Sequence, residues 1–205
     1  MGTLTMKFGG ASVGTSTALS QVLSIIIHES KRWDKVLIVA SALEGVTDML
    51  LEAAQLAQLS NQRGYRRIAA TLRTRHMALI EQLPLGTTER ATLQADVDSL
   101  LFDMLDQCQA VANELSDDLS PKVSDSIVAV GERLSARIIA ALLRQNGLRG
   151  VAVDGTDILV TDEVHGNADP DIMKTSHRVN EILLPMLDRK IIPVVTGYIG
   201  STMHG

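Results

Sequence analysis

Several short segments of the sequence carry residue types that bind charged small molecules. In residues 6–14, Lys7 stands just before the glycine pair Gly9 and Gly10, between an apolar run and a helix-compatible segment. Such a strand-to-helix turn leaves backbone N–H groups unpaired and directs the positive end of a helix dipole at one point, which suits a phosphate. Lys7 adds a full positive charge there, although it precedes the glycines and so makes no Walker A loop. The alternative interpretation is an ordinary turn with a solvated lysine.

A second turn with ligand-binding groups spans residues 41–47. Ser41 and Thr47 place hydroxyl groups at its two ends, with Gly45 between them. These hydroxyl groups could hold a small polar ligand. Thr47 is equally suited to cap the N-terminus of the helix that follows, so both interpretations stand at this point.

Glu132 is a carboxylate in an otherwise apolar helical segment. An isolated buried charge is costly, so this side chain needs a partner. One hypothesis is an internal ion pair with Arg133 or Arg137. The other is a ligand ammonium group held by Glu132, with Gly131 allowing a close approach.

The remaining reactive side chains indicate no metal site and no covalent nucleophile. The five histidines show no metal-ligand spacing, and Cys108 occupies an apolar-face position of a helical segment. Residues 197–200, Gly-Tyr-Ile-Gly, repeat the strand-then-glycine pattern. They form either another anion-facing turn or a plain loop.

The pattern of apolar residues predicts the elements that must position these groups. Uninterrupted apolar runs such as residues 35–40 are typical of parallel strands covered on both faces. Strands alternate with helices, which predicts an α/β fold with a mainly parallel sheet flanked by helices. Ligands then bind beyond the carboxyl ends of the strands, where the glycine turns lie. The predicted strands are residues 4–8, 35–40, 150–154, 158–160 and 191–197.

The helices predicted after the second strand form a separate group. No strand interrupts them between about residues 48 and 113, which predicts an all-helical insert in the α/β domain. A polar linker is expected at residues 117–121, and Gly147 is expected to end the helix before the third strand. The predicted helices are residues 15–30, 47–59, 65–83, 87–113, about 121–146, and 171–188.

The composition excludes several classes of protein. The chain has 205 residues, a net charge of −5 and scattered Lys and Arg, which gives no electrostatic footprint for nucleic acid. The basic residues of segment 63–75 follow a helical pattern and predict a solvated face. The single cysteine fits a reducing compartment and no apolar run approaches membrane-span length, so we expect a cytoplasmic protein without membrane contact. The chain stops shortly after a strand without a closing helix, which predicts a fragment.

Taken together, the glycine turns and the acidic helix resemble the aspartate kinase family, which has the amino-acid kinase fold. They occur in the family's order and near its spacing, over essentially the whole chain, and a helical insert is expected for that family. The resemblance implies that residues 1–205 are the N-terminal, amino-acid-binding part of the catalytic domain, without the nucleotide-binding half and the regulatory domains. The motifs are Lys7-Phe8-Gly9-Gly10-Ala11-Ser12-Val13, Ser41-Ala42 with Gly45-Val46-Thr47, Gly131-Glu132 with Ser135, and Thr196-Gly197-Tyr198-Ile199-Gly200.

The resemblance also implies a reaction and roles for residues. The enzyme would transfer the γ-phosphoryl group of ATP to the side-chain carboxylate of L-aspartate, the first step of lysine, threonine and methionine biosynthesis, with Mg²⁺ held mainly by the nucleotide. Lys7 would be the catalytic residue, and Thr47 and Glu132 would hold the amino acid, Glu132 through its ammonium group. A homo-oligomer is compatible with this family. The residues implied to bind the phosphate groups of ATP are Lys7, Gly9, Gly10, Ser12 and Ser41.

The sequence departs from the family pattern in two places, and other functions stay open. Ala11 stands where the family usually has threonine, which removes a hydroxyl group near the phosphate turn. The chain also stops before the family's Gly-Arg-Gly-Gly-Ser-Asp segment, which would supply another substrate-binding arginine. The alternatives are a related amino-acid kinase with another acceptor and a non-catalytic binding or assembly module. A dinucleotide-binding oxidoreductase is disfavoured because no acidic residue closes the second strand at Ala40-Ser41.

Overall fold

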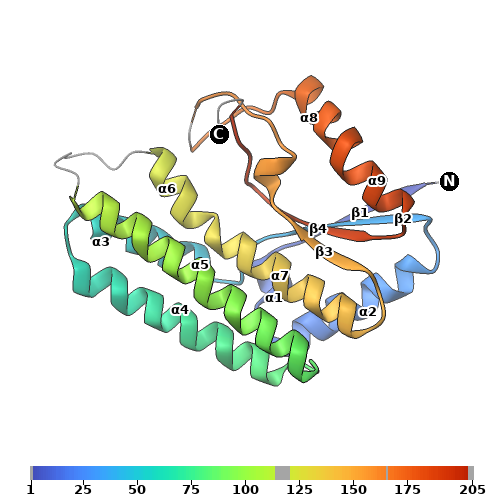
Figure 1. Cartoon of the computed structure of the whole chain (residues 1–205), viewed down its shortest axis with the longest axis horizontal. Coiled ribbons are helices and arrows are strands. Elements are labelled where there is room, and N and C mark those ends of the chain that lie inside the picture. Colours follow the sequence, from blue (N-terminus) through green and yellow to red (C-terminus); the bar gives the residue numbers. More distant parts are fainter. Residues whose placement is uncertain (1, 114–120, 165, 203–205) are drawn as a thin grey trace.

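A parallel sheet forms the centre of the fold. In the computed structural model, which describes residues 2–113, 121–164 and 166–202, four strands pair in the order β1-β2-β4-β3 (Figure 1). All three pairings are parallel. The strands are β1 Thr3–Phe8, β2 Lys35–Ala40, β3 Gly150–Val153 and β4 Ile192–Thr196.

The strand sequences explain why both faces of the sheet are covered. Every residue of β4 is buried, and its β-branched valine pair lies at the centre of the sheet. β2 alternates between buried and half-buried residues, so neither of its faces meets open solvent. Because the strands are parallel, their carboxyl ends meet at one edge of the sheet, and the turns singled out in the sequence follow at that edge.

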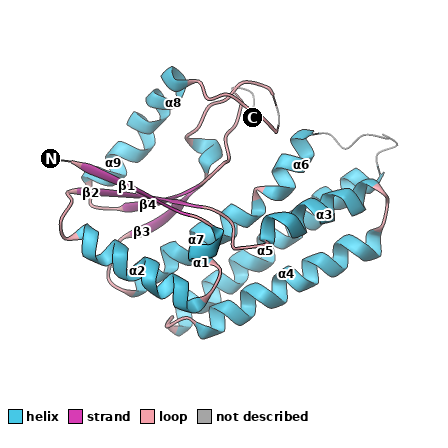
Figure 2. Ribbon diagram, turned by 180° about the vertical axis from the view of Figure 1, so that it is seen from behind, coloured by secondary structure: helices cyan, strands magenta, loops and turns pink. Residues whose placement is uncertain are grey.

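Helices pack on both faces of the sheet (Figure 2). On one face, the residues of α2 and α7 share a large apolar core with Ile38 and Val194. On the other face, the C-terminal helical segments cover a smaller cluster that contains Val153, Leu183 and Val195. The helical elements of these two layers are α1 Gly10–Val13, α2 Ser16–Ser30 and α7 Val130–Gln145, and α8 Ile172–Arg178, the π-turn Val179–Leu183 and α9 Leu184–Asp188.

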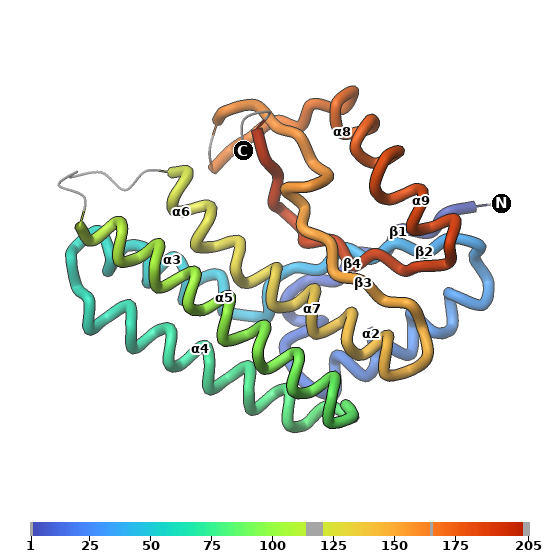
Figure 3. Tube along the Cα trace, in the orientation of Figure 1, coloured from blue at the N-terminus to red at the C-terminus, as the bar shows by residue number. Residues whose placement is uncertain are grey.

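The helical insert is confirmed as a group of long helices packed side by side next to α7 (Figures 1 and 3). Its apolar faces join the larger core without a boundary, so the insert and the sheet domain form one packed body. Cys108 is fully buried there, and burial raises the pKa of its thiol to about 11, which makes it an inert core residue. The insert helices are α3 Val46–Gln58, α4 Gln62–Gln82 and α5 Thr87–Asn113, and α6 Pro121–Val128 follows them.

Three sequence predictions about the elements are wrong in detail. Helix α4 begins at Gln62, three residues earlier than predicted, because the Asn61 side chain accepts a hydrogen bond from the Gly64 N–H and caps the helix. Residues 121–146 form two helices that meet at Ala129 instead of one. Residues 158–160 are not a strand, because a 3₁₀ turn at Gly155–Asp157 precedes them and Val160 makes only a single bridge.

The other predicted elements are found within a few residues of their expected bounds. Gly147 has φ +76°, which confirms the left-handed residue expected after α7. The predicted helix 171–188 is interrupted by a π-turn just before Pro185, which has no N–H to continue the helical bonding. Most of the predicted linker 117–121, and His165 and His204, lie outside the described residues. Among the described helices, none is long and apolar enough to cross a membrane.

Candidate active site

The first two turns at the carboxyl edge of the sheet are locked together by backbone contacts. The Ser41 N–H donates to the Phe8 carbonyl at 3.1 Å, and the Glu44 N–H donates to the Gly10 carbonyl at 3.3 Å. A Cβ atom at Gly10 would lie 2.9 Å from the Ala42 carbonyl oxygen, so only glycine fits there. The helix that follows, α1, has four residues, and its dipole adds little, which leaves Lys7 as the main source of positive charge.

Lys7 is not a freely solvated lysine. Its ammonium group donates to the Tyr198 hydroxyl at 2.9 Å and lies 4.2 Å from the centre of the tyrosine ring. Tyr198 follows β4, is 84% exposed and has φ +57°, a conformation that costs free energy in a residue other than glycine. The contact therefore holds the lysine across the carboxyl edge of β2 toward the end of β4. The sequence singled out the segment of Tyr198 but gave no sign of this contact.

Glu132 is buried and has no charged partner within the part of the chain that the structure describes. It is 6% exposed, its Oε1 accepts the Ala42 N–H at 3.2 Å, and its Oε2 has no hydrogen-bond partner among the described residues. Burial raises the pKa of this carboxyl above its usual value, although the Ala42 N–H lowers it in part. The internal ion pair is a wrong prediction, because Arg133 binds Asp154 and Arg137 lies near Asp96. Glu132 therefore presents an oxygen that can accept a hydrogen bond from a ligand.

The two hydroxyl groups of the second turn belong to Ser41 and Thr47. Helix α3 begins at Val46 with Gly45 at the N-cap position at φ +73°, so the N-cap prediction for Thr47 is wrong. Thr47 lies one residue further into the first turn and is half-buried, as is Ser41 at the end of β2. Neither hydroxyl group is committed to capping this helix.

Gly131 brings helix α7 against the turn after β2. A Cβ atom at this position would lie 2.7 Å from the Ala42 Cβ and 3.2 Å from the Leu50 and Val46 side chains. The glycine thus sets the distance between α7 and the turn, which carries the hydrogen bond from Ala42 to Glu132. The sequence hypothesis had a ligand approaching Gly131 closely; in the structure the groups nearest to it are the chain's own Ala42, Val46 and Leu50 side chains.

We expect Gly131→Ala to destabilise the fold and disturb the Glu132 contact. Overpacking of this kind typically lowers the free energy of unfolding by ~1–3 kcal/mol, and the higher helix propensity of alanine offsets at most ~1 kcal/mol of that loss. Urea unfolding of the variant measures the net loss. Gly9→Ala is the matched control, because a Cβ at Gly9 meets no atom of the described residues within 4 Å. Equal stability of the two variants would contradict the packing argument.

An open cleft of about 1070 Å³ lies between the α6–α7 region and the loops after β3 and β4. Glu132 and Arg133 line it from α7, and Tyr198 lines it from the β4 side. The remaining predicted site residues are not among those that line the cleft within the described part of the chain; they lie at or after the carboxyl ends of β1 and β2 and are Lys7, Gly9, Gly10, Ser12, Ser41 and Thr47. Tyr198 joins the two groups, because it lines the cleft and contacts Lys7.

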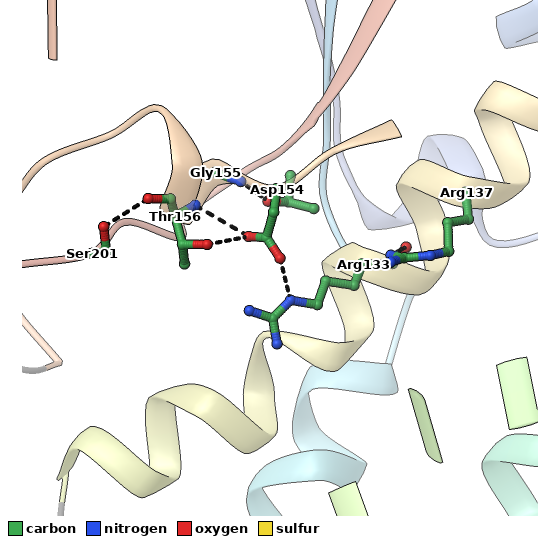
Figure 4. Close-up of polar contacts among 7 residues, drawn as sticks. Arg133, Arg137, Asp154, Gly155, Thr156 and Ser201 are labelled. Carbon is green, nitrogen blue, oxygen red and sulfur yellow. Dashed lines mark hydrogen bonds and ion pairs between the residues drawn. The ribbon is translucent and has the colours of Figure 1, made fainter. Parts of the chain in front are cut away.

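A polar network closes the β3 side of the cleft (Figure 4). Asp154 Oδ1 accepts the Thr156 N–H at 3.1 Å and its hydroxyl at 3.0 Å, while Oδ2 accepts the Nε–H of Arg133 at 2.5 Å. Burial raises the pKa of Asp154, but the hydrogen bonds from Arg133 and Thr156 outweigh it, so the net pKa lies below its usual value. The Thr156 carbonyl accepts the Ser201 hydroxyl at 2.7 Å and Arg178 Nη1 at 2.9 Å. Sequence reasoning missed this network, although an aspartate directly after a strand was a signal for it.

The chain is similar to aspartokinases over its whole length. The family model described as Amino acid kinase family matches residues 3–205. The chain is 27% identical to an aspartokinase of Candida albicans, with 100% of the chain and 39% of the relative covered. It is 28% identical to an aspartokinase of Chlamydia muridarum, with 98% and 40% covered, and 26% identical to lysine-sensitive aspartokinase 3 of Escherichia coli, with 97% and 41% covered.

Solved structures agree with the fold. The crystal structure of E. coli aspartokinase III in complex with aspartate and ADP superposes with a TM-score of 0.83 at 24% identity, over 98% of this chain and 42% of that one. The aspartate kinase of Clostridium acetobutylicum superposes with a TM-score of 0.70 at 18% identity. The predicted amino-acid kinase fold is confirmed. The chain spans about two fifths of the length of these three aspartokinase relatives.

Proposed function

The chain belongs to the amino acid kinase family, and on this premise we propose that it is the N-terminal, amino-acid-binding part of an aspartate kinase catalytic domain. The similarity to aspartokinases across the whole chain supports this assignment. The reaction is transfer of the ATP γ-phosphoryl group, with Mg²⁺ on the nucleotide, to the side-chain carboxylate of L-aspartate. Because the chain spans about 40% of those relatives, the nucleotide-binding half and the regulatory domains are assigned to residues beyond these 205.

The free oxygen of Glu132 is the observation that carries the proposal. A buried carboxylate that lacks a cationic partner destabilises the fold, and such groups occur where function requires them. An amino-acid ammonium group supplies the missing charge and three N–H donors. Glu132 faces a cleft large enough for a small molecule, which gives the ammonium group a route to it.

The other assigned residues lie near the carboxyl ends of β1 and β2, and Glu132 is joined to this edge of the sheet by its hydrogen bond from the Ala42 N–H. Thr47 and Ser41 offer hydroxyl groups from the turn after β2, and Lys7 offers a charge from β1. Phosphoryl transfer is catalysed mainly by positioning and by neutralising charge, so a lysine and backbone N–H donors are sufficient without a covalent nucleophile. The proposed phosphate contacts are Lys7, Gly9, Gly10, Ser12 and Ser41.

We expect Glu132→Gln to weaken L-aspartate binding by about 10- to 100-fold, since a hydrogen bond to a charged group contributes ~1.5–3 kcal/mol. Calorimetric titration of wild type and variant with L-aspartate measures this loss. In the full encoded protein, ATP binding should change much less. Equal losses for both substrates would contradict the assigned role, and tighter binding of another amino acid than of aspartate would favour a kinase with a different acceptor.

The same variant should stabilise the free protein at neutral pH. The pKa of Glu132 is raised in the folded state. At a pH below the pKa of this group in the unfolded chain, the carboxyl is protonated in both the folded and the unfolded state and does not lower the free energy of unfolding. As the pH rises through the folded pKa, the native carboxyl must ionise while buried, and stability is lost. Glutamine removes this loss, so the variant should unfold at a higher temperature than wild type near neutral pH and at the same temperature in acid. A variant that is less stable at neutral pH would show that Glu132 is structural.

A further inference from the structure

Helix α4 of the insert contacts the turn after β2 through one long side chain. Arg75 donates from Nη2 to the Glu44 carbonyl at 2.6 Å, and its Nη1 lies 3.8 Å from the place that a Cβ would take at Gly45. The hydrogen bonding of helix α3 begins one residue later, where the Gly45 carbonyl accepts the Met49 N–H at 3.3 Å. Arg75 therefore supplies a charged donor to a carbonyl that precedes the helix.

Glu44 also packs on the first glycine turn. Its N–H donates to the Gly10 carbonyl at 3.3 Å. A Cβ at Gly10 would lie 3.2 Å from the Glu44 nitrogen, and a Cβ at Gly14 would lie 3.4 Å from the Glu44 Cβ. The backbone of Glu44 is thus held by the first turn through its N–H and by the insert through its carbonyl.

The same helix has a second contact with the segment that follows the first turn. The Ser16 hydroxyl, at the start of α2, donates to Gln82 Oε1 in the last turn of α4 at 3.0 Å. Arg75 and Gln82 lie about 10 Å apart along α4, at a rise of about 1.5 Å per residue. One rigid helix therefore contacts the chain on both sides of the two glycine turns.

We propose that Arg75 is a positioning residue for phosphoryl transfer. It acts through Glu44 on the backbone of the first turn, where Gly9 and Gly10 are the proposed phosphate donors. Preorganised donors are effective because they do not have to reorganise during the reaction, and a displacement of about 1 Å can cost about 100-fold in rate. The inference rests on the proposed function and gives the helical insert a part in it.

Steady-state kinetics of the full encoded protein test this role. Arg75→Met removes the donors and should lower kcat by about 10- to 100-fold. The Michaelis constant for L-aspartate should change by less than about threefold, because the Ala42 N–H still holds Glu132. Arg75→Lys keeps a charged donor and should have a kcat between those of wild type and Arg75→Met. This lysine variant carries the test alone if the methionine variant does not fold.

A matched control comes from the same helix. Arg73 lies two residues before Arg75 and forms a two-pronged ion pair with Asp98 of α5, at 2.6 and 3.1 Å. Arg73→Met removes an arginine of the insert whose printed partner lies within the insert itself. It should leave kcat near that of wild type.

Hydrogen–deuterium exchange gives a second readout that needs no substrate. Exchange is followed by mass spectrometry on peptides that cover residues 41–47 of the full encoded protein, which include the Glu44 N–H. In Arg75→Met this segment should exchange about 3- to 10-fold faster, as expected when one hydrogen bond is lost. In Arg73→Met its exchange should be unchanged.

The outcomes separate this inference from the function on which it rests. Unchanged exchange in Arg75→Met, or faster exchange with an unchanged kcat, would overturn the positioning role and leave the kinase assignment standing. An equal loss of kcat in Arg73→Met, or a lysine variant no more active than Arg75→Met, would also overturn it, in favour of general packing of the insert. A wild-type protein without aspartate-dependent ADP release would overturn the proposed function together with this inference.

Discussion

The 205 residues alone should bind L-aspartate but should release no ADP from magnesium-ATP above the background rate. The groups proposed to hold the amino acid are present, while the proposed nucleotide site lies beyond these residues. A phosphoryl donor that is not held beside its acceptor forfeits the proximity contribution, which reaches ~7–11 kcal/mol in well-oriented systems. Retained contacts to the acceptor cannot replace a contribution of that size.

A coupled ADP-release assay with L-aspartate and magnesium-ATP measures this prediction, beside a calorimetric titration with aspartate. The full encoded protein is the positive control when its reading frame continues past residue 205. Turnover by the 205 residues at the rate of an intact kinase would place the nucleotide site within them. A silent assay without aspartate binding would instead support the non-catalytic binding or assembly module.

The second large effect concerns Lys7. In the full encoded protein, Lys7→Ala should lower kcat strongly and change the Michaelis constant for aspartate little, because the charge acts chiefly in the transition state. Loss of one preorganised donor typically costs ~2.7–4 kcal/mol, or about 10²–10³ in rate.

Two control variants test whether the effect belongs to this lysine. Lys35→Ala removes a strand lysine at the opposite edge of the sheet, where it pairs with Asp188, and should leave kcat near that of wild type. Tyr198→Phe keeps the ring beside Lys7 but removes the hydroxyl contact, so it should have a smaller effect than Lys7→Ala. Near-normal turnover of Lys7→Ala would show that Lys7 is not catalytic.

Elements with a strong local signal could be predicted from the sequence. Strand β2 at 35–40 and helix α5 at 87–113 have the predicted bounds, because an unbroken apolar run and a long amphipathic pattern leave few alternatives. The predicted strand at 158–160 failed for a non-local reason. The Gly155 N–H donates to the Thr196 hydroxyl, which fixes the 3₁₀ turn through a residue 41 positions away.

The same distinction applies to the site. The glycine turns were visible in the sequence, because their chemistry is local. Whether Glu132 forms an ion pair could not be predicted, because this depends on where the Arg133 and Arg137 side chains point. In the structure both arginines have other acids as neighbours. The contact of Lys7 with Tyr198 joins residues 191 positions apart, and no periodicity reports such a pair.

The strand order β1-β2-β4-β3 has a consequence for the timing of folding during synthesis. β2 pairs with β1 early, but its other edge must wait for β4. At ~5–20 residues per second, the roughly 150 residues between them take about 8–30 s to emerge from the ribosome. The helices α3, α4 and α5 make mostly local contacts and can pack within that interval. A nascent chain should therefore carry a formed helical bundle beside an exposed apolar strand, and this is the interval in which chaperone binding matters most.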